Sequence, residues 1–245
     1  MPTRLSYRVR ERAGVPVGEF RLSSDNGVNP LSSPVVAEIR ERLQGLDNVD
    51  PPYALLFAAT GRCFCAGADI KEFRDITVDG FRRYMTDVLA MYAEMAELRK
   101  PILSLVHADA RGGGAAIALF SDFAIAARDA MFALPEVHRG LAGGGYLMPR
   151  LVGKHRAAEM VMLGRSYTAA EMAGMGLLTE VCGAEELEAS ADRLFGELAA
   201  LAPGAFAVAK RSLAAGLGLP LRDAMAVHVE AQTTAFVQAR ERGLL

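Results

Sequence analysis

The sequence predicts an α/β fold in which a parallel sheet is flanked by helices. Short apolar runs typical of buried strands alternate with segments whose apolar residues recur every three or four positions, as in amphipathic helices. This alternation is typical of crossover connections between parallel strands. With 245 residues, 51% of them hydrophobic, and 24 glycines, the chain is long enough to bury a large core within one α/β domain.

The expected elements follow in order along the chain. Strands are expected at residues 17–22, 53–59, 102–106, 123–127 and 176–181, and helices at residues 35–46, 80–98, 114–120, 156–163, 184–201 and 221–240. Ser33 and Pro34 favour the start of the first helix, and Pro101 favours the end of the long one. Thr168 and Glu171 have the spacing of a capping box. Residues 1–200 form the predicted core, and residues 201–245 a helical region of the same functional domain.

Charge and composition exclude several classes of protein. A formal net charge of -2 provides no broad cationic surface for nucleic acid or for an anionic membrane. No apolar run approaches the roughly 18 residues of a membrane span, so we expect cytoplasmic residence. Three cysteines, Cys63, Cys65 and Cys182, lack the spacing of a zinc site and are expected to be reduced and packed. The scattered histidines predict no metal site, and no G-x-G-x-x-G fingerprint follows the first strand.

Two glycine-rich turns carry the strongest functional signal. The first lies in residues 62–71, Arg-Cys-Phe-Cys-Ala-Gly-Ala-Asp-Ile-Lys, and the second runs from Arg111 to Gly114, about one βα unit later. Each follows an apolar run and opens a helix, so two backbone N–H groups can point at one oxygen atom, as in an oxyanion hole. A triple glycine alone indicates only a tight turn, whereas the pair favours the oxyanion hole. Asp69 is expected to cap a short helix rather than to act in catalysis.

This pair of turns resembles the crotonase superfamily, also called the enoyl-CoA hydratase/isomerase superfamily, and the resemblance extends over residues 19–181. Its further motifs are Asn29-Pro30-Leu31-Ser32, Pro135-Glu136, Leu151-Val152-Gly153 and the segment from Ala170 to Leu178. The resemblance implies a crotonase-like spiral of ββα units with a helical C-terminal trimerisation region. It also implies a homotrimer or homohexamer that acts on an acyl-CoA and needs no cofactor beyond the coenzyme A of the substrate.

The resemblance assigns the main binding groups. It implies that the backbone N–H groups of Ala68 and Gly113 hold the thioester oxygen. Coenzyme A is expected beside the first turn, with contacts from Arg62, Ala66 and Lys71. Phe236 matches a family aromatic that reaches the nucleotide of a neighbouring subunit. The lysine expected beside it is replaced by Ala239, and Arg240 is the available substitute.

Glu136 is the expected general base. Hydratases of the superfamily use two glutamates to activate one water, and the position of the first is occupied here by Ala116. A single carboxylate can move a proton from C2 to C4 of a 3-enoyl thioester, so double-bond isomerisation is favoured over hydration. A carboxylate in an apolar cleft is expected to have a raised pKa, which suits reversible proton transfer near neutral pH.

The alternatives are hydration despite Ala116, decarboxylation or carbon–carbon hydrolysis through the same enolate, and a non-catalytic protein that binds acyl-CoA. His138 and Tyr146 could face the acyl pocket. We expect His138 to be non-catalytic, because no Asp or Ser accompanies it at a suitable spacing, and His107 to be a structural hydrogen-bonding residue. Acyl identity depends on residues 77–91 and on Tyr146. Coenzyme A and a carrier protein remain equally open as the thioester carrier.

Overall fold

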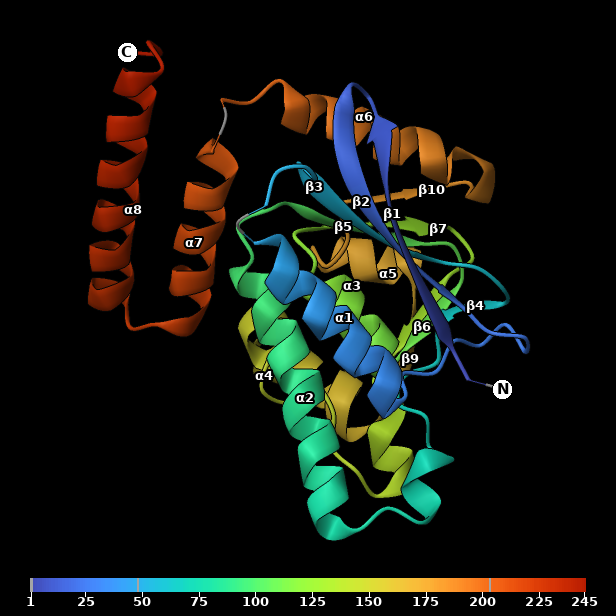
Figure 1. The fold of residues 1–245 in the computed structure, drawn as a ribbon. Coiled ribbons are helices and arrows are strands. Elements are labelled where there is room, and N and C mark those ends of the chain that lie inside the picture. Colours follow the sequence, from blue (N-terminus) through green and yellow to red (C-terminus); the bar gives the residue numbers. More distant parts are fainter. Residues whose placement is uncertain (1, 48, 203) are drawn as a thin grey trace.

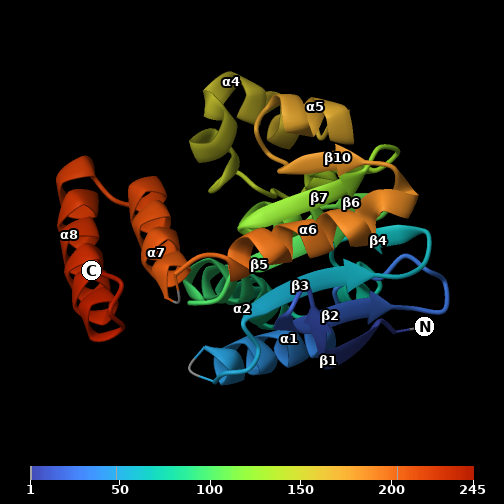
Figure 2. The ribbon, with the colours of Figure 1, turned by 90° about the horizontal axis from the view of Figure 1, so that it is seen from above.

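The computed structural model describes residues 2–47, 49–202 and 204–245. Two sheets form its centre (Figures 1 and 2). The larger sheet has the strand order β1-β2-β3-β5-β7-β10, with β1 (Arg4–Arg12), β2 (Val15–Ser23), β3 (Ala54–Ala59), β5 (Ile102–Val106), β7 (Phe123–Ala127) and β10 (Glu180–Cys182). The smaller sheet has the order β4-β6-β8-β9, with β4 (Cys63–Cys65), β6 (Asp109–Arg111), β8 (Met131–Ala133) and β9 (Ser166–Thr168).

The chain forms successive ββα units. Strands β3, β5 and β7 pair in parallel in the larger sheet, and the strand that follows each of them, β4, β6 or β8, pairs in parallel in the smaller sheet. The helices are α1 (Ser33–Leu46), α2 (Val78–Glu97), α3 (Gly113–Phe120), α4 (Met148–Met162), α5 (Ala169–Gly174), α6 (Leu187–Ala199), α7 (Ala205–Gly218) and α8 (Leu221–Glu241). Three short 3₁₀ turns are η1 (Glu72–Arg74), η2 (Pro135–Arg139) and η3 (Ala184–Glu186). The spiral of ββα units implied by the resemblance is therefore confirmed.

The central strands of the larger sheet, β3 and β5, are buried on both faces. Alternate residues of β3 belong to two apolar clusters: Leu55 and Phe57 pack on the side of α1, α2 and α3, and Leu56 packs on the side of α6. Figure 1 shows α6 on one side of this sheet, with α1, α2 and α3 on the other. Because both faces are covered, β3 is a continuous apolar run rather than an alternating one.

Helices α7 and α8 form a hairpin that stands to one side of the core (Figures 1 and 2). A largely buried ion pair attaches α7 to the core, with the Lys210 side chain 5% and the Asp122 side chain 17% exposed. Lys210 Nζ lies 2.7 Å from an Asp122 carboxylate oxygen, and the same oxygen accepts the N–H of Ile102 at the start of β5. Lys210 also donates to the carbonyl of Lys100. Within the helical region predicted at residues 201–245, the first helix, α7, is therefore held to the core by Lys210.

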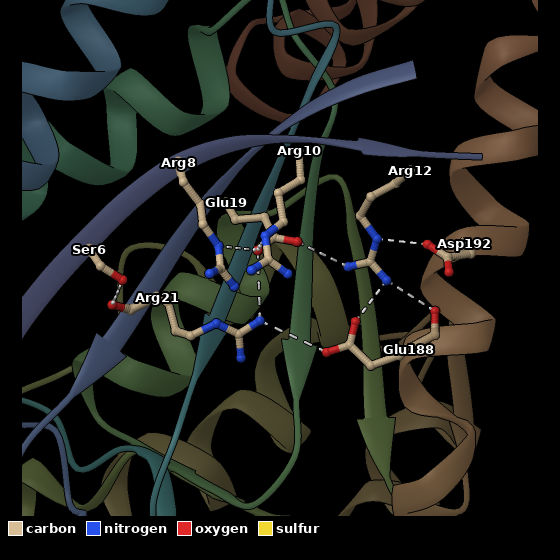
Figure 3. A network of polar contacts seen from close by, with 8 residues as sticks. All are labelled: Ser6, Arg8, Arg10, Arg12, Glu19, Arg21, Glu188 and Asp192. Carbon is tan, nitrogen blue, oxygen red and sulfur yellow. Dashed lines mark hydrogen bonds and ion pairs between the residues drawn. The ribbon is translucent and has the colours of Figure 1, made fainter. Parts of the chain in front are cut away.

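A charged cluster covers the outer face of β1 and β2 (Figure 3). The Glu19 side chain is only 4% exposed, and guanidinium nitrogens approach its carboxylate at 3.2 Å, 3.5 Å, 3.9 Å and 3.9 Å. These nitrogens belong to Arg8, Arg12, Arg10 and Arg21. Arg12 also binds Glu188 and Asp192 of α6, so the cluster ties the N-terminal hairpin to that helix.

Several predicted elements differ from the structure. Strand β1 was not predicted, although Leu5, Tyr7 and Val9 alternate with polar residues in the pattern of a half-exposed edge strand. Helix α7 was also not predicted, and α4 begins at Met148 rather than at residue 156, with a non-helical Gly153 inside it. The strand predicted at 176–181 begins later, at Glu180, and ends at Cys182, because Gly176 adopts a φ of +73° in a turn.

Local signals at single residues were more accurate. The capping box at Thr168 and Glu171 is confirmed, with the side chain of each residue bonded to the backbone N–H of the other. All three cysteines are free, as expected. No helix within the described ranges is both long and apolar enough to cross a membrane.

Candidate active site

An apolar cavity of about 240 Å³ lies between α2, the two glycine-rich turns and residues 134–146. Its lining is dominated by aliphatic, aromatic and glycine residues from these segments. The residues used below are Ala66, Gly67, Ala68, Tyr92, Gly112, Gly113, Ala116, Glu136, Arg139 and Tyr146. The two turns predicted to act together therefore meet at one cavity, although their sequence positions are more than forty residues apart.

The first turn presents Ala68 to the cavity. Leu31 bonds to the residues on either side of Ala68: its N–H donates to Gly67 O at 2.8 Å, and its carbonyl accepts the N–H of Asp69 at 3.1 Å. In such a parallel bridge, the N–H of the central residue points away from the partner strand. Gly67 has a φ of +86°, a conformation that side chains disfavour. The Ala68 N–H is thereby left free of Leu31.

The second turn places Gly113 at the first position of α3. Gly112 has a φ of +50° and donates its N–H to Ala133 O at 2.8 Å, which anchors the turn to β8. The first N–H groups of a helix lack intrahelical acceptors and lie at the positive end of its dipole. Among the described residues, neither the Gly113 N–H nor the Ala68 N–H has a hydrogen-bond acceptor. Both donors are available to a bound oxygen.

The close approach of the two turns explains the glycines. A Cβ atom on Gly67 would lie 2.9 Å from Arg111 O and 3.2 Å from Gly113 N. On the neighbouring side, a Cβ on Gly113 would lie 3.0 Å from the Tyr92 hydroxyl. That hydroxyl donates to Gly113 O at 3.1 Å and fixes the turn from α2. The two N–H donors are therefore held by packed backbone rather than by mobile side chains.

The side chain of Asn29 holds the backbone just before the first turn. Its side-chain amide donates to Thr60 O at 2.8 Å and to Cys63 O at 2.9 Å, and its side-chain oxygen accepts the Ser24 hydroxyl. Asn29 itself is fully buried and has a φ of +51°, a conformation that asparagine tolerates better than most residues. The Asn-Pro-Leu-Ser motif thus supports the loop that carries Ala68.

Glu136 lies on η2 beside the second turn. A Cβ on Gly112 would lie 2.8 Å from Glu136 Oε1, and a Cβ on Gly143 would lie 2.3 Å from its carboxyl carbon. The carboxylate is thus enclosed between two glycine backbones. Among the described residues its buried Oε2 has no hydrogen-bond partner. Burial raises the pKa of Glu136, while a hydrogen bond from its own backbone opposes the shift. A weakly solvated carboxylate of this kind is suited to accept a proton.

An alanine, Ala116, occupies the position at which hydratases of the superfamily are expected to carry a second glutamate. Ala116 is 8% exposed and lines the same cavity, and Glu136 is the one acidic residue among the described lining residues. Tyr92, Phe120 and Tyr146 form a stack with ring centroids 5.0 Å and 6.3 Å apart. Burial and then Glu136 raise the pKa of Tyr146 to about 12, so its phenol is neutral at physiological pH.

Of the four residues predicted to contact coenzyme A, one lines the cavity and three lie outside its lining. Ala66 lines the cavity, whereas Arg62 and Lys71 are exposed outside it. Arg62 Nε donates to Asn26 O at 3.1 Å. Phe236 lies on α8, is 52% exposed and packs against Arg240, with the guanidinium 5.7 Å from the ring centre. A single chain therefore does not bring Arg62, Lys71 and Phe236 to the cavity lining.

His107, His138 and Asp69 form hydrogen bonds to the backbone outside the cavity lining. His138 bonds to Leu163 O at 3.0 Å, and His107 bonds to Gly61 O at 2.9 Å. Asp69 accepts the backbone N–H of Lys71 in the turn before η1. None of these three side chains lines the cavity. Within the described ranges, no group of three or more His, Cys, Asp and Glu side chains could hold a metal ion.

Two parts of the lining were incompletely predicted. Helix α2 contributes Phe81, Tyr84, Met85, Val88 and Leu89 in addition to Tyr92. Phe81 to Leu89 lie within residues 77–91, the segment expected to determine the acyl group, and their spacing of three and four residues forms one apolar face of α2. Arg139 also lines the cavity, and the sequence offered only its position three residues after Glu136.

Comparison with known proteins agrees with this geometry. A family model described as Enoyl-CoA hydratase/isomerase matches residues 13–245. A Dictyostelium discoideum protein named "Probable enoyl-CoA hydratase, mitochondrial" is 31% identical over 210 residues, which cover 84% of this chain and 75% of that protein. A Rhizobium meliloti protein named "Probable enoyl-CoA hydratase" is 32% identical over 213 residues, covering 85% and 82%.

Solved structures give the same result. The structure of an enoyl-CoA hydratase from Bacillus anthracis superposes with a TM-score of 0.87 at 25% identity, covering 98% of this chain and 96% of that one. The paired turns, the spiral of ββα units and the sequence relatives point to one family. The chain belongs to the enoyl-CoA hydratase/isomerase family, a family of enzymes.

Proposed function

We propose that this protein isomerises the double bond of a 3-enoyl-CoA to give the conjugated 2-enoyl-CoA. The observation that carries the proposal is that Glu136 is the one carboxylate among the described residues lining the cavity, with Ala116 where a second glutamate is expected. Removal of a proton from C2 and its return at C4 require one base, whereas activation of a water by this family's route uses two carboxylates.

The chemistry follows from the site. Glu136 takes the C2 proton, and the electron pair moves into the thioester, whose oxygen becomes negative. The N–H groups of Ala68 and Gly113 hydrogen-bond to that oxygen, and one such donor is worth about 3 kcal/mol of barrier in other enzymes. Protonated Glu136 then returns its proton to C4. Its raised pKa favours the first step, because the carboxylate is then a stronger base and its basicity is closer to that of the enolate.

Turnover of a 3-enoyl-CoA of medium chain length tests the proposal directly. Conjugation is followed by absorbance and the product by mass. An absorbance increase at unchanged mass supports isomerisation, whereas addition of one water supports hydration. If the purified protein changes neither signal over a series of chain lengths, the proposal fails.

Hydration is the second candidate, because the relatives named above carry the name enoyl-CoA hydratase. In that case a water would be activated by Glu136 alone, with the neutral hydroxyl of Tyr146 as the neighbouring polar group. The substitution Tyr146→Phe separates the two candidates. It should abolish a hydration that depends on the hydroxyl and leave isomerisation within about threefold, because the base is unchanged.

We further propose that the protein assembles as a homotrimer or homohexamer through its C-terminal hairpin. Large apolar side chains on α7 and α8 are strongly exposed in the single chain, including Leu213 at 70%, Leu221 at 72% and Val229 at 59%. Exposed apolar area of this extent is typical of interaction surfaces. Light scattering coupled to gel filtration tests this, and a monomer at micromolar concentration would contradict it.

A further inference from the structure

Arg139 is the one cation among the described residues that line the active-site cavity. It ends η2, three residues after Glu136, and is exposed. No hydrogen bond or ion pair joins its guanidinium to another described residue. Because the rest of the described lining is apolar apart from Glu136 and three tyrosines, Arg139 places an unneutralised positive charge at the wall of the acyl site.

This charge is not paired with the catalytic base. Among the described residues no hydrogen bond or ion pair joins the guanidinium to Glu136, whose buried Oε2 has no hydrogen-bond partner. Arg139 is exposed, so its guanidinium is available to a different anion.

We propose that Arg139 binds a carboxylate at the far end of the acyl chain, so that the substrate is the enoyl thioester of a dicarboxylic acid. This inference rests on the proposed function, because it assigns the acyl group of the same site. A guanidinium binds a carboxylate through two parallel N–H donors, which is its strongest and most specific interaction.

The cavity itself favours an acyl carboxylate over a phosphate of coenzyme A. The oxyanion donors and Glu136 line the same 240 Å³ as Arg139, and a cavity of about 150 Å³ holds one benzene molecule. The space therefore accommodates an acyl chain of roughly six to eight carbon atoms and cannot hold the pantetheine arm and nucleotide as well. The cations expected to meet the phosphates, Arg62 and Lys71, lie outside this lining.

Binding of unreactive saturated thioesters tests the assignment independently of turnover. Octanoyl-CoA and octanedioyl-CoA have the same chain length and differ in the terminal methyl and carboxylate groups. Calorimetry of the wild-type protein should give a dissociation constant about tenfold or more lower for octanedioyl-CoA. Arg139→Gln should remove this preference by weakening octanedioyl-CoA binding alone, and Arg139→Lys should restore part of it.

Arg83→Gln is the matched control, because Arg83 is exposed on α2, which lines the cavity, but is not itself a lining residue. It removes the same charge and should leave the preference intact. Equal weakening of both ligands by Arg139→Gln would assign Arg139 to a coenzyme A phosphate and overturn the inference. Equal affinity of the wild-type protein for both ligands would also overturn it.

Turnover then separates this inference from the proposed function. The 3-enoyl forms of the same two thioesters should be isomerised, with kcat/KM about tenfold or more higher for the dicarboxylic substrate. Arg139→Gln should remove this difference chiefly through KM. If both are isomerised at equal kcat/KM by the wild-type protein, the inference fails and the isomerase stands. If neither reacts while octanedioyl-CoA still binds in an Arg139-dependent way, the isomerase fails and the carboxylate site stands.

Discussion

Replacement of Glu136 by glutamine should abolish turnover while preserving ligand binding. The glutamine keeps the size of the side chain, so the cavity bounded by Gly112 and Gly143 is unchanged, but the amide cannot accept the C2 proton. General base catalysis contributes roughly 10²- to 10⁴-fold. Since the described lining contains no other carboxylate, we expect the upper part of this range, a fall in kcat of about 10³- to 10⁴-fold, or about 4 to 5.5 kcal/mol.

The pH dependence gives the same residue a second signature. Glu136 must be ionised to act as base, and burial raises its pKa above the ordinary value. The acidic limb of kcat/KM should therefore lie above the usual glutamate pKa of about 4.3, with activity rising as pH increases through it. This limb should be absent from any residual activity of Glu136→Gln.

Stability should respond in the opposite sense to activity. A carboxyl whose pKa is raised by folding favours the folded state most when protonated, and this contribution is lost as pH rises through the folded pKa. At pH 7 the ionised Glu136 therefore lowers the free energy of unfolding, and Glu136→Gln should unfold at the same temperature as the wild type or higher.

The assay measures isomerisation by absorbance, affinity for a saturated acyl-CoA by calorimetry, and unfolding by circular dichroism. Glu136→Asp is the matched control: it retains the charge but withdraws it by one methylene, and a misplacement of about 1 Å can cost about 10²-fold. Wild-type turnover by Glu136→Gln, within tenfold, would refute the assignment of the base. A parallel loss of binding and folding would show that Glu136 is structural.

Four further substitutions test the supporting structure. Tyr92→Phe removes the hydroxyl that fixes the second turn; it should cost about 1 kcal/mol of stability and lower kcat more than it changes KM, as steady-state kinetics would show. Glu19→Gln leaves four guanidinium groups around a neutral amide and should lower the free energy of unfolding in urea by about 3 kcal/mol, whereas Arg10→Gln, which removes a half-exposed partner at 3.9 Å, should cost less than about 1 kcal/mol. Lys210→Met leaves Asp122 buried without its cation; it should destabilise the chain by about 3 to 5 kcal/mol and shift the protein toward smaller species in gel filtration, and an unchanged oligomer would show that α7 is held by other contacts.

The main parallel strands could be predicted from the sequence because each is covered on both faces. Strands β5 and β7 have the expected bounds, residues 102–106 and 123–127. The edge strand β1 is not a continuous apolar run, since one of its faces carries the arginines that surround Glu19, and the signal that identifies it is the alternation of Leu5, Tyr7 and Val9 with polar residues. The strands of the smaller sheet are three residues long, which is too short for a period of two to be recognised.

The meeting of the two glycine-rich turns could be predicted because backbone contact constrains the residue type. Gly67 and Gly112 have positive φ angles, and a Cβ atom on Gly67 would contact the other turn. The backbone geometry that places the two donors therefore requires glycine at these positions, and glycine is visible in the sequence. The position of Glu136 beside them was accessible only through its motif. Nothing in the spacing of residues 112 and 136 shows that their atoms come within contact distance.

The residues that would select the acyl group are less constrained by the fold than the glycines of the two turns, so a motif cannot predict the acyl group. Its walls come from the apolar face of α2 and from residues 134–146, and many apolar side chains would satisfy the fold at those positions. The N–H donors stabilise negative charge on a thioester oxygen whatever acyl chain is attached. In the proposed mechanism, enolate chemistry depends on backbone that tolerates little change, whereas the proposed choice of substrate depends on a few side chains, such as Arg139 and Tyr146, that can change without loss of the fold. For this reason the glycine turns in the sequence were enough to propose the reaction class, and the substrate was proposed only from the assembled cavity.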